Sequence, residues 1–172
     1  QALSGASNVS PSQILANPNL ETINSEGWPL GWPTLPEAEL KREGDDNFVR
    51  VNQAEPDEWT MLYRAATVPA GCGALRFSLN ARVLDLVPGA NIWNEARVVF
   101  QFKDLNGTVI RPRPRPLILG KKGSNSWSER SVEFLVPENA ATLEVIQSRT
   151  KFHSKKATRK IIRPKYSWLE IV

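Results

Sequence analysis

Long polar side chains alternate with apolar residues in two neighbouring stretches of the chain. Residues 75–83 and 97–103 each place an apolar side chain at every second position, which predicts β-strands with one apolar and one polar face. The polar faces carry amide, guanidinium and ammonium groups, which suit hydrogen bonding to sugar hydroxyls. These side chains are Arg76, Asn80, Arg82, Gln101 and Lys103. We interpret the stretches as two central strands of one antiparallel sheet, so that the five side chains share a sugar-binding face.

Aromatic rings would complete such a site, because the flat face of a sugar packs against them. Trp93 lies in the Asn-flanked segment between the two predicted strands, and Trp59 lies at the start of an earlier one. We predict these two as the stacking platforms. Trp28 and Trp32 lie among prolines, so we interpret them as capping one end of the core, with a sugar platform as the alternative. Trp127 is predicted to be a core residue.

Residues for catalysis are scarce. The one histidine, His153, lies in a basic segment where nothing positions it for triad chemistry. The one cysteine, Cys72, allows no internal disulfide, and no metalloprotease, P-loop or dinucleotide motif is present. Glu129 and Glu133 share one face of a predicted strand and are interpreted as surface residues. We therefore predict that the chain is not an enzyme.

The basic residues are concentrated in two segments. Residues 148–172 hold eight of the 22 Lys and Arg residues and one of the 18 Asp and Glu residues. Within them, residues 149–165 read either as a long hairpin with charged edges or as an arm for a polyanion. The sequence RPRPRP at residues 111–116 predicts an extended edge strap, with solvated arginines or an anionic partner as alternatives. We expect neither a membrane nor nucleic acid as a partner, because no apolar run approaches about 20 residues and the basic character is local.

The remaining elements define the fold class. Strands are predicted at 47–53, 59–68, 117–119, 127–136, 142–148 and 166–172, besides the two described above. Turn signals separate them, consistent with 13 Pro and ten Gly residues in 172. No segment shows a helical period. The prediction is an all-β, antiparallel β-sandwich, most consistent with a jelly roll, with residues 1–16 as a flexible lead-in and residues 17–172 as a single domain.

Short segments along most of residues 17–148 resemble carbohydrate-binding modules of the family 4 and 9 type. They are NPNLE at 17–21, GWPLGWP at 27–33, VPAG at 68–71, ARVVFQFKDLNG at 96–107, Trp127, and VPENAATLEV at 136–145. The order and spacing of these segments carry the resemblance. It implies a galactose-binding-like jelly roll that binds glycan on a concave sheet face or at its rim.

The resemblance also implies partners and a metal. Such modules are usually joined to an exported polysaccharide-degrading enzyme, such as a glycoside hydrolase, so we expect a secreted, periplasmic or cell-surface location. Many hold a structural Ca²⁺, which would use Glu21 here; Leu169 and Glu170 stand where the family has its second acid. We predict a non-catalytic module that binds a polysaccharide, and the candidates for that polysaccharide include anionic and algal polymers. The alternative is a structural sandwich that packs on a neighbouring catalytic domain and binds no sugar.

Overall fold

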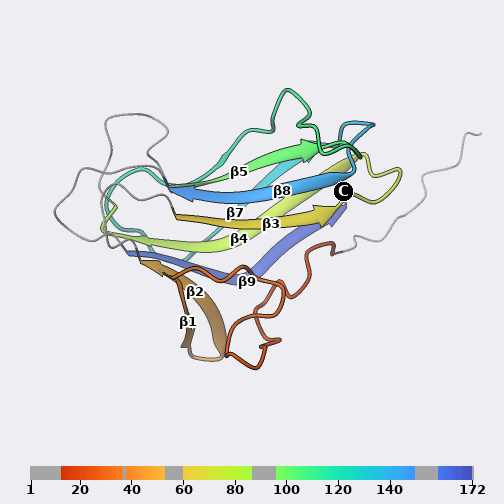
Figure 1. Ribbon diagram of the computed structural model, residues 1–172. Helices are drawn as coiled ribbons and strands as arrows, with labels where there is room; N and C mark the ends of the chain where they lie inside the picture. The colour runs from red at the N-terminus through yellow and green to blue at the C-terminus, as the bar shows by residue number, and fades with distance from the viewer. Residues whose placement is uncertain (1–12, 37, 53–59, 87–95, 150–158, 172) are drawn as a thin grey trace, which may run out of the picture.

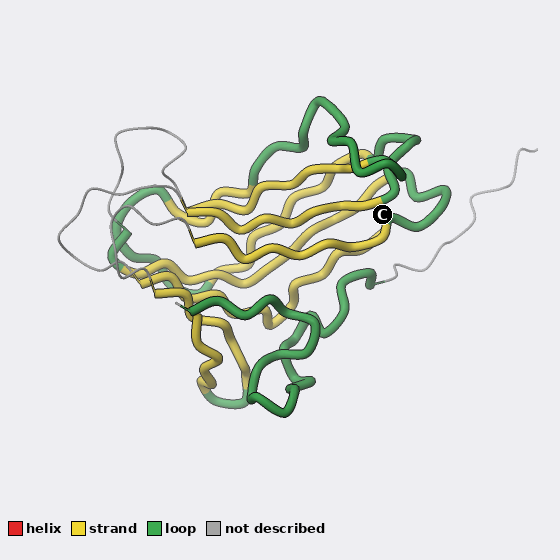
Figure 2. The backbone as a smooth tube through the Cα atoms, viewed as in Figure 1, coloured by secondary structure: helices red, strands yellow, loops and turns green. Residues whose placement is uncertain are grey.

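The structure is a computed structural model that describes residues 13–36, 38–52, 60–86, 96–149 and 159–171. For residues 52, 60–61, 147–149 and 159–171 it describes the backbone alone. Figure 2 shows strands and loops throughout this part of the chain. Within it there is no helix long and apolar enough to cross a membrane.

Within these described residues, nine strands form two packed antiparallel sheets (Figure 1). The strands are β1 (Ala38–Glu43), β2 (Asp46–Asn52), β3 (Thr60–Thr67), β4 (Ala74–Leu84), β5 (Ala96–Lys103), β6 (Leu117–Gly120), β7 (Ser128–Leu135), β8 (Thr142–Arg149) and β9 (Arg159–Ile171). One sheet has five strands in the order β1-β2-β9-β4-β7, and the other has four in the order β3-β8-β5-β6.

The strand pairing is that of a jelly roll. β5 pairs with β6, β4 with β7, β3 with β8 and β2 with β9. Each pair encloses the one before it, as if one long hairpin had been rolled up, so that successive pairs fall in alternate sheets. The predicted all-β jelly roll is therefore confirmed, and β1 adds a fifth strand to one sheet.

The core lies between the two sheets and follows the predicted alternation. Along β4 the odd-numbered residues from Leu75 to Val83 are buried, and along β5 the even-numbered residues from Ala96 to Phe102 are buried. The rings of Phe77 and Phe100 meet between the sheets with centroids 5.1 Å apart. Burying a side chain of this size contributes about 1.5–3 kcal/mol, so these inward faces hold the two sheets together.

One central prediction is wrong: β4 and β5 are not strands of one sheet. β4 lies in the five-stranded sheet and β5 in the four-stranded sheet. Because the apolar faces of both strands point inward, their polar faces point away from each other on opposite sides of the sandwich. A period of two identifies the buried face of a strand, but it carries no information on which sheet the strand joins.

The N-terminal segment packs against β2 of the five-stranded sheet. Leu20 and Trp28 are buried against Val49 and Val51 of β2. The indole nitrogen of Trp28 donates to the carbonyl oxygen of Trp32 at 3.1 Å, so the interpretation of these rings as a core cap fits the structure.

Packing begins earlier than the predicted boundary at residue 16. Leu15 is buried in the main core, and Ile14 packs against it. A guanidinium nitrogen of Arg64 on β3 donates to the carbonyl oxygen of Ala16 at 3.0 Å. The lead-in predicted as residues 1–16 is therefore too long by at least these residues, while residues 1–12 lie outside the described part of the chain.

The last strand is longer than predicted. β9 begins at Arg159 instead of residue 166 and lies centrally between β2 and β4. Residues 159–165 are thus neither a hairpin edge nor a separate arm. The sequence predicted a strand only after Pro164, because proline has no N–H to donate to a sheet ladder. The β4–β9 register shifts between Ser78 and Asn80, where Arg163 and Trp168 are the flanking partners, and this irregularity accommodates the proline.

Candidate functional site

The structure divides the predicted site residues between the two outer faces. Arg76, Asn80 and Arg82 lie on the outer face of the five-stranded sheet, because they alternate with the buried residues of β4. Gln101 and Lys103 lie on the outer face of the four-stranded sheet, by the same alternation along β5. The predicted shared face of these five residues is therefore wrong. Trp59 and Trp93, the predicted platforms, lie outside the described residues.

The two predicted arginines on the five-stranded face, Arg76 and Arg82, are engaged within the protein. Arg76 binds the carboxylate of Glu133 directly across from it on β7, with the Nε atom 2.7 Å from Oε1. Arg82 donates to Glu43 at 3.3 Å, and its guanidinium carbon lies 4.7 Å from the centre of the Trp127 ring. Trp127 is half-buried and packs edge-on against Phe48 instead of joining the main core.

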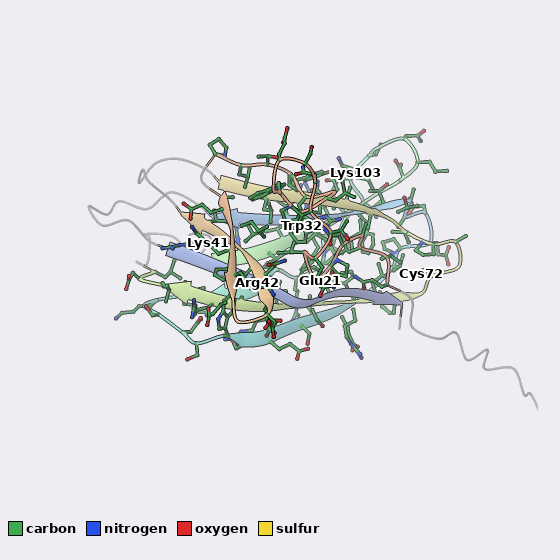
Figure 3. The ribbon with its side chains drawn as sticks, turned by 90° about the horizontal axis from the view of Figure 1, so that it is seen from below. Glu21, Trp32, Lys41, Arg42, Cys72 and Lys103 are labelled. Carbon is green, nitrogen blue, oxygen red and sulfur yellow. The ribbon has the colours of Figure 1, made fainter. Side chains whose placement is uncertain are left out.

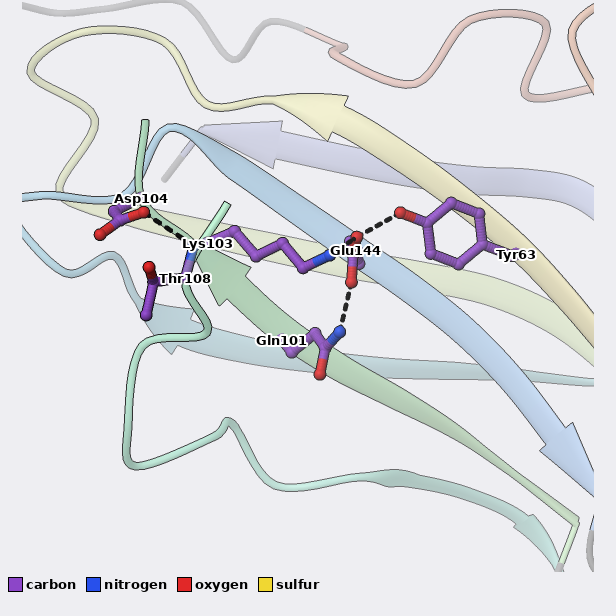
Figure 4. Close-up of polar contacts among 6 residues, drawn as sticks. All are labelled: Tyr63, Gln101, Lys103, Asp104, Thr108 and Glu144. Atoms are coloured by element: carbon purple, nitrogen blue, oxygen red, sulfur yellow. Dashed lines mark hydrogen bonds and ion pairs between the residues drawn. The ribbon is translucent and has the colours of Figure 1, made fainter. Parts of the chain in front are cut away.

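The outer face of the four-stranded sheet holds a polar network around one carboxylate (Figure 4). Glu144 of β8 is only 4% exposed. It accepts hydrogen bonds from the Tyr63 hydroxyl on β3 and the Gln101 side-chain amide on β5. The Lys103 ammonium lies 2.6 Å from Oε1 of the same carboxylate. Three strands thus contribute four side chains to one cluster, which we call the Glu144 network.

Sheet pairing explains why these side chains meet. Gln101 and Glu144 are direct cross-strand partners in the β5–β8 ladder, and direct partners on one face have side chains close enough to bond. Tyr63 is the partner of Ile146 in the β3–β8 ladder, and Ile146 lies two residues after Glu144 on the same face of β8. The tyrosine ring therefore reaches along the sheet to place its hydroxyl on the carboxylate.

Burial and hydrogen bonding set the ionisation of the network. Burial by itself raises the pKa of Glu144, but hydrogen bonds from Gln101, Lys103 and Tyr63 outweigh it, and the pKa is lowered overall. The pKa of Tyr63 is raised to about 12, by burial first and then by the hydrogen bond and the negative charge of Glu144. At neutral pH the network therefore holds an ionised glutamate beside a neutral tyrosine.

Several groups of the network remain able to bind a ligand. Tyr63 is 42% exposed, so part of its ring is available for stacking. Gln101 uses its amide nitrogen on Glu144, which leaves its carbonyl oxygen as an acceptor. An ammonium carries three donors, and the Lys103 side chain is 30% exposed. The buried carboxylate thus fixes the positions of a ring, an amide and a cation on one face.

Sequence reasoning missed Tyr63 and Glu144. The only signal was alternation: Glu144 lies between Leu143 and Val145, so it falls on the polar face of its strand. Nothing local shows that its partners come from 81 and 43 residues away, at Tyr63 and Gln101. The network therefore depends on sheet pairing that an alternating pattern does not specify.

The predicted calcium ligand lies in the N-terminal segment, which Figure 3 shows from below. Glu21 is exposed there. In the described part of the chain, no three His, Cys, Asp or Glu residues are grouped so that they could hold a metal ion. The calcium prediction therefore depends on the side chains of residues 169–170, which lie outside the description, and it stays a prediction.

Comparisons with known proteins show likeness in fold without likeness in sequence. No protein-family model and no curated protein sequence matches this chain. Its backbone is similar to the enzymatically active domain of tailspike protein 4 of bacteriophage CBA120, with a TM-score of 0.55 and 9% identity over 87% of this chain. The match spans only 20% of that tailspike chain. At this identity the likeness shows the fold alone.

Carbohydrate-binding modules are also among the structural neighbours. The C-terminal family 22 module of Clostridium thermocellum Xyn10B gives a TM-score of 0.46 and 16% identity, covering 91% of this chain and 96% of the module. A family 28 module specific for non-crystalline cellulose gives 0.44 and 11%, covering 92% and 93%. The neighbours therefore include modules of this class, while the resemblance to families 4 and 9 stays a prediction.

Proposed function

We propose that this chain is a non-catalytic carbohydrate-binding module, which targets an appended polysaccharide-degrading enzyme to its glycan. The Glu144 network is the observation that carries this proposal. A sugar offers apolar ring faces and many hydroxyl groups, and the network offers a partly exposed ring beside fixed polar groups. Side chains that are already held in place lose little conformational entropy when a ligand binds.

The chemistry of the network favours binding over catalysis. Glycoside hydrolysis uses two carboxyl groups, one of which donates a proton. Glu144 is the one carboxylate on the described strands of this face. It accepts bonds from three donors, and its pKa is lowered, so it is a poor proton donor at neutral pH.

The ligand we propose is a polysaccharide, and an acidic one, such as a sulfated algal polymer, is favoured by the exposed arginines at positions 111, 113 and 115. A module of this kind acts where such polymers are found. We therefore also propose a secreted, periplasmic or cell-surface location for the parent protein.

The test is affinity electrophoresis against a panel of neutral and acidic polysaccharides. Wild-type protein should be retarded by at least one of them, and Tyr63→Ala and Gln101→Ala should each lose most of the retardation. Arg76→Ala on the opposite face is the matched control and should behave as wild type. No retardation of wild type by any polymer, or equal losses in all three variants, would count against the proposal.

A second candidate function is supported by exposed leucines at one end of the sandwich. Leu105 is 92% exposed and Leu135 is 82% exposed. They follow Phe102 and Phe134, whose ring centroids lie 5.8 Å apart, so both leucines lie near the same end. In this second function the chain is a structural domain, and a neighbouring catalytic domain covers the two leucines. The chain would bind no polysaccharide, and Leu105→Ser with Leu135→Ser would lower its affinity for that neighbour.

A further inference from the structure

An arginine–proline segment runs beside β5, next to the Glu144 network. This strap, residues 111–116, joins a bridge between Lys103 and Val109 to the pairing of Leu117 with Val98. Leu117 lies eight residues after Val109, whereas their partners on β5, Val98 and Lys103, lie only five residues apart. The strap therefore bows away from the strand, and Figure 1 shows the loop between β5 and β6 rising above the sheet.

The strap is unable to act as a sheet strand, and its arginines face solvent. Prolines at 112, 114 and 116 have no N–H to donate to a ladder. Arg111, Arg113 and Arg115 are all exposed, and among the described residues none of them has a hydrogen bond or ion pair. Proline also fixes its own backbone angle, so the three guanidinium groups project from a stiff support.

The sequence around the strap has no acidic residue to balance these charges. Residues 105–120 contain three basic side chains, the arginines of the strap, and no Asp or Glu. Lys103, the cation of the Glu144 network, is already paired with Glu144. On the five-stranded face, by contrast, Arg76 and Arg82 each have an acidic partner. The strap is thus a concentrated and unbalanced positive charge at the edge of the proposed binding face.

We propose that the strap is a subsite for the acidic groups of the polysaccharide, either sulfate or carboxylate, a proposal that rests on the function proposed above. Guanidinium groups bind both anions with paired, charge-assisted hydrogen bonds. The stiff backbone lowers the entropy lost when they bind. A glycan whose rings lie over the Glu144 network places its charged substituents within reach of the strap, because the strap runs along the neighbouring edge of β5.

Acidic polysaccharide suits this surface better than nucleic acid. Proteins that bind single-stranded nucleic acid stack bases on several aromatic side chains along a basic groove. Residues 108–126, which include the strap, contain no aromatic side chain. The strap instead adjoins side chains that suit hydroxyl groups.

The experiment compares polymers that share a backbone but differ in charge. Calorimetry would measure binding of dextran sulfate against dextran, and of polygalacturonate against its methyl ester. The strap variant R111Q/R113Q/R115Q is matched by K41Q/R42Q/R130Q, which removes three exposed charges from β1 and β7. Wild type should prefer the charged member of a pair, more strongly at low salt. The strap variant should bind it about tenfold more weakly, and the control should stay within about twofold.

Two further variants make the outcomes separable. R111K/R113K/R115K keeps the charge but loses the paired geometry, so its affinity should fall between those of wild type and the glutamine variant. If Tyr63→Ala abolishes binding of the acidic polymer while the strap variant binds like wild type, the subsite is overturned and the proposed function stands. If wild type binds no glycan, both proposals fail. A preference for single-stranded DNA over every acidic glycan at equal salt would also overturn the subsite.

Discussion

On the outer face of the five-stranded sheet, each described arginine of β4 has its own acidic partner. Arg76 binds Glu133, and Arg82 binds Glu43 while it stacks on Trp127. The side chains of the Arg76–Glu133 pair are 41% and 55% exposed. Exposed pairs of this kind contribute about 0–1 kcal/mol because water solvates and screens both charges.

The outer face of the four-stranded sheet uses its acid differently. One buried carboxylate, Glu144, takes hydrogen bonds from three side chains on two neighbouring strands. Removing one member of a buried polar cluster leaves the others without partners, which is costly. Residue types alone therefore did not separate the two faces: the five-stranded face has more arginines, but the four-stranded face has the fixed and partly available groups of the proposed binding site.

The largest expected difference between the faces is in stability. Glu144→Gln should lower the free energy of unfolding by about 1–3 kcal/mol, because it removes the charge that Lys103 faces and forces new hydrogen-bond geometry. Glu133→Gln, its matched control on the other face, should lower it by less than about 0.5 kcal/mol. Urea denaturation followed by tryptophan fluorescence measures both. Equal losses would remove the distinction between the faces.

The pH dependence of stability should also originate on the four-stranded face. The pKa of Glu144 is lowered in the folded protein, so its contribution is complete above the unfolded value of about 4.3 and is lost as the pH falls below it. The pKa of Tyr63 is raised to about 12, so its contribution is lost as the pH rises from about 10 towards that value.

Urea midpoints across the pH range test this prediction. Glu144→Gln should flatten the acid limb, and Tyr63→Phe should flatten the alkaline limb. Titration of tyrosinate absorbance should show one group near the raised pKa, lost in Tyr63→Phe, since the chain has only two tyrosines. A Tyr63 that titrates at its ordinary pKa would contradict the network.

Matched substitutions on the two faces should differ by about one order of magnitude in their effect on glycan affinity. Gln101→Ala should weaken binding of the preferred polysaccharide by about tenfold, because one positioned hydrogen-bonding group is lost. Asn80→Ala removes a similar amide from the opposite face and should change the affinity by less than about twofold. Isothermal calorimetry measures both affinities. A larger loss for Asn80→Ala would move the site to the five-stranded sheet.

The smallest expected effect concerns Arg82. Arg82→Gln should lower stability by about 0.5–1 kcal/mol through loss of its stacking on Trp127, without affecting glycan binding. Quenching of tryptophan fluorescence by acrylamide should increase as the Trp127 ring becomes more accessible. A loss of glycan binding in this variant would restore the predicted role of Arg82 as a sugar ligand.

Alternation along the chain was enough to predict most of the strands and the fold class. The inward faces of β4 and β5 follow the predicted period, and the bounds of β2, β7 and β8 lie within a residue or so of those expected. β1 was not predicted, since its charged sequence AELKRE shows little apolar character. The start of β9 was missed because Pro164 reads as a break, whereas an irregularity in the ladder tolerates it.

The candidate site was predicted only in part. The sequence singled out Gln101 and Lys103 correctly as outward polar residues of β5, and it grouped them with Arg76, Asn80 and Arg82, which lie on the other side of the sandwich. Glu144 and Tyr63 were missed. Local patterns give the face of each strand, while the choice of neighbour depends on how the whole chain rolls up.

The sequence by itself determined which faces of β4 and β5 point into the core, because the period of two is a local property that the hydrophobic effect acts on directly. It also determined the proline-stiffened, unbalanced charge of the strap at 111–116. Only the tertiary structure decided that Tyr63, Gln101, Lys103 and Glu144 meet on one face. Their contacts join strands that are far apart in the chain, and such pairing is set by the packing of two complete sheets against one core.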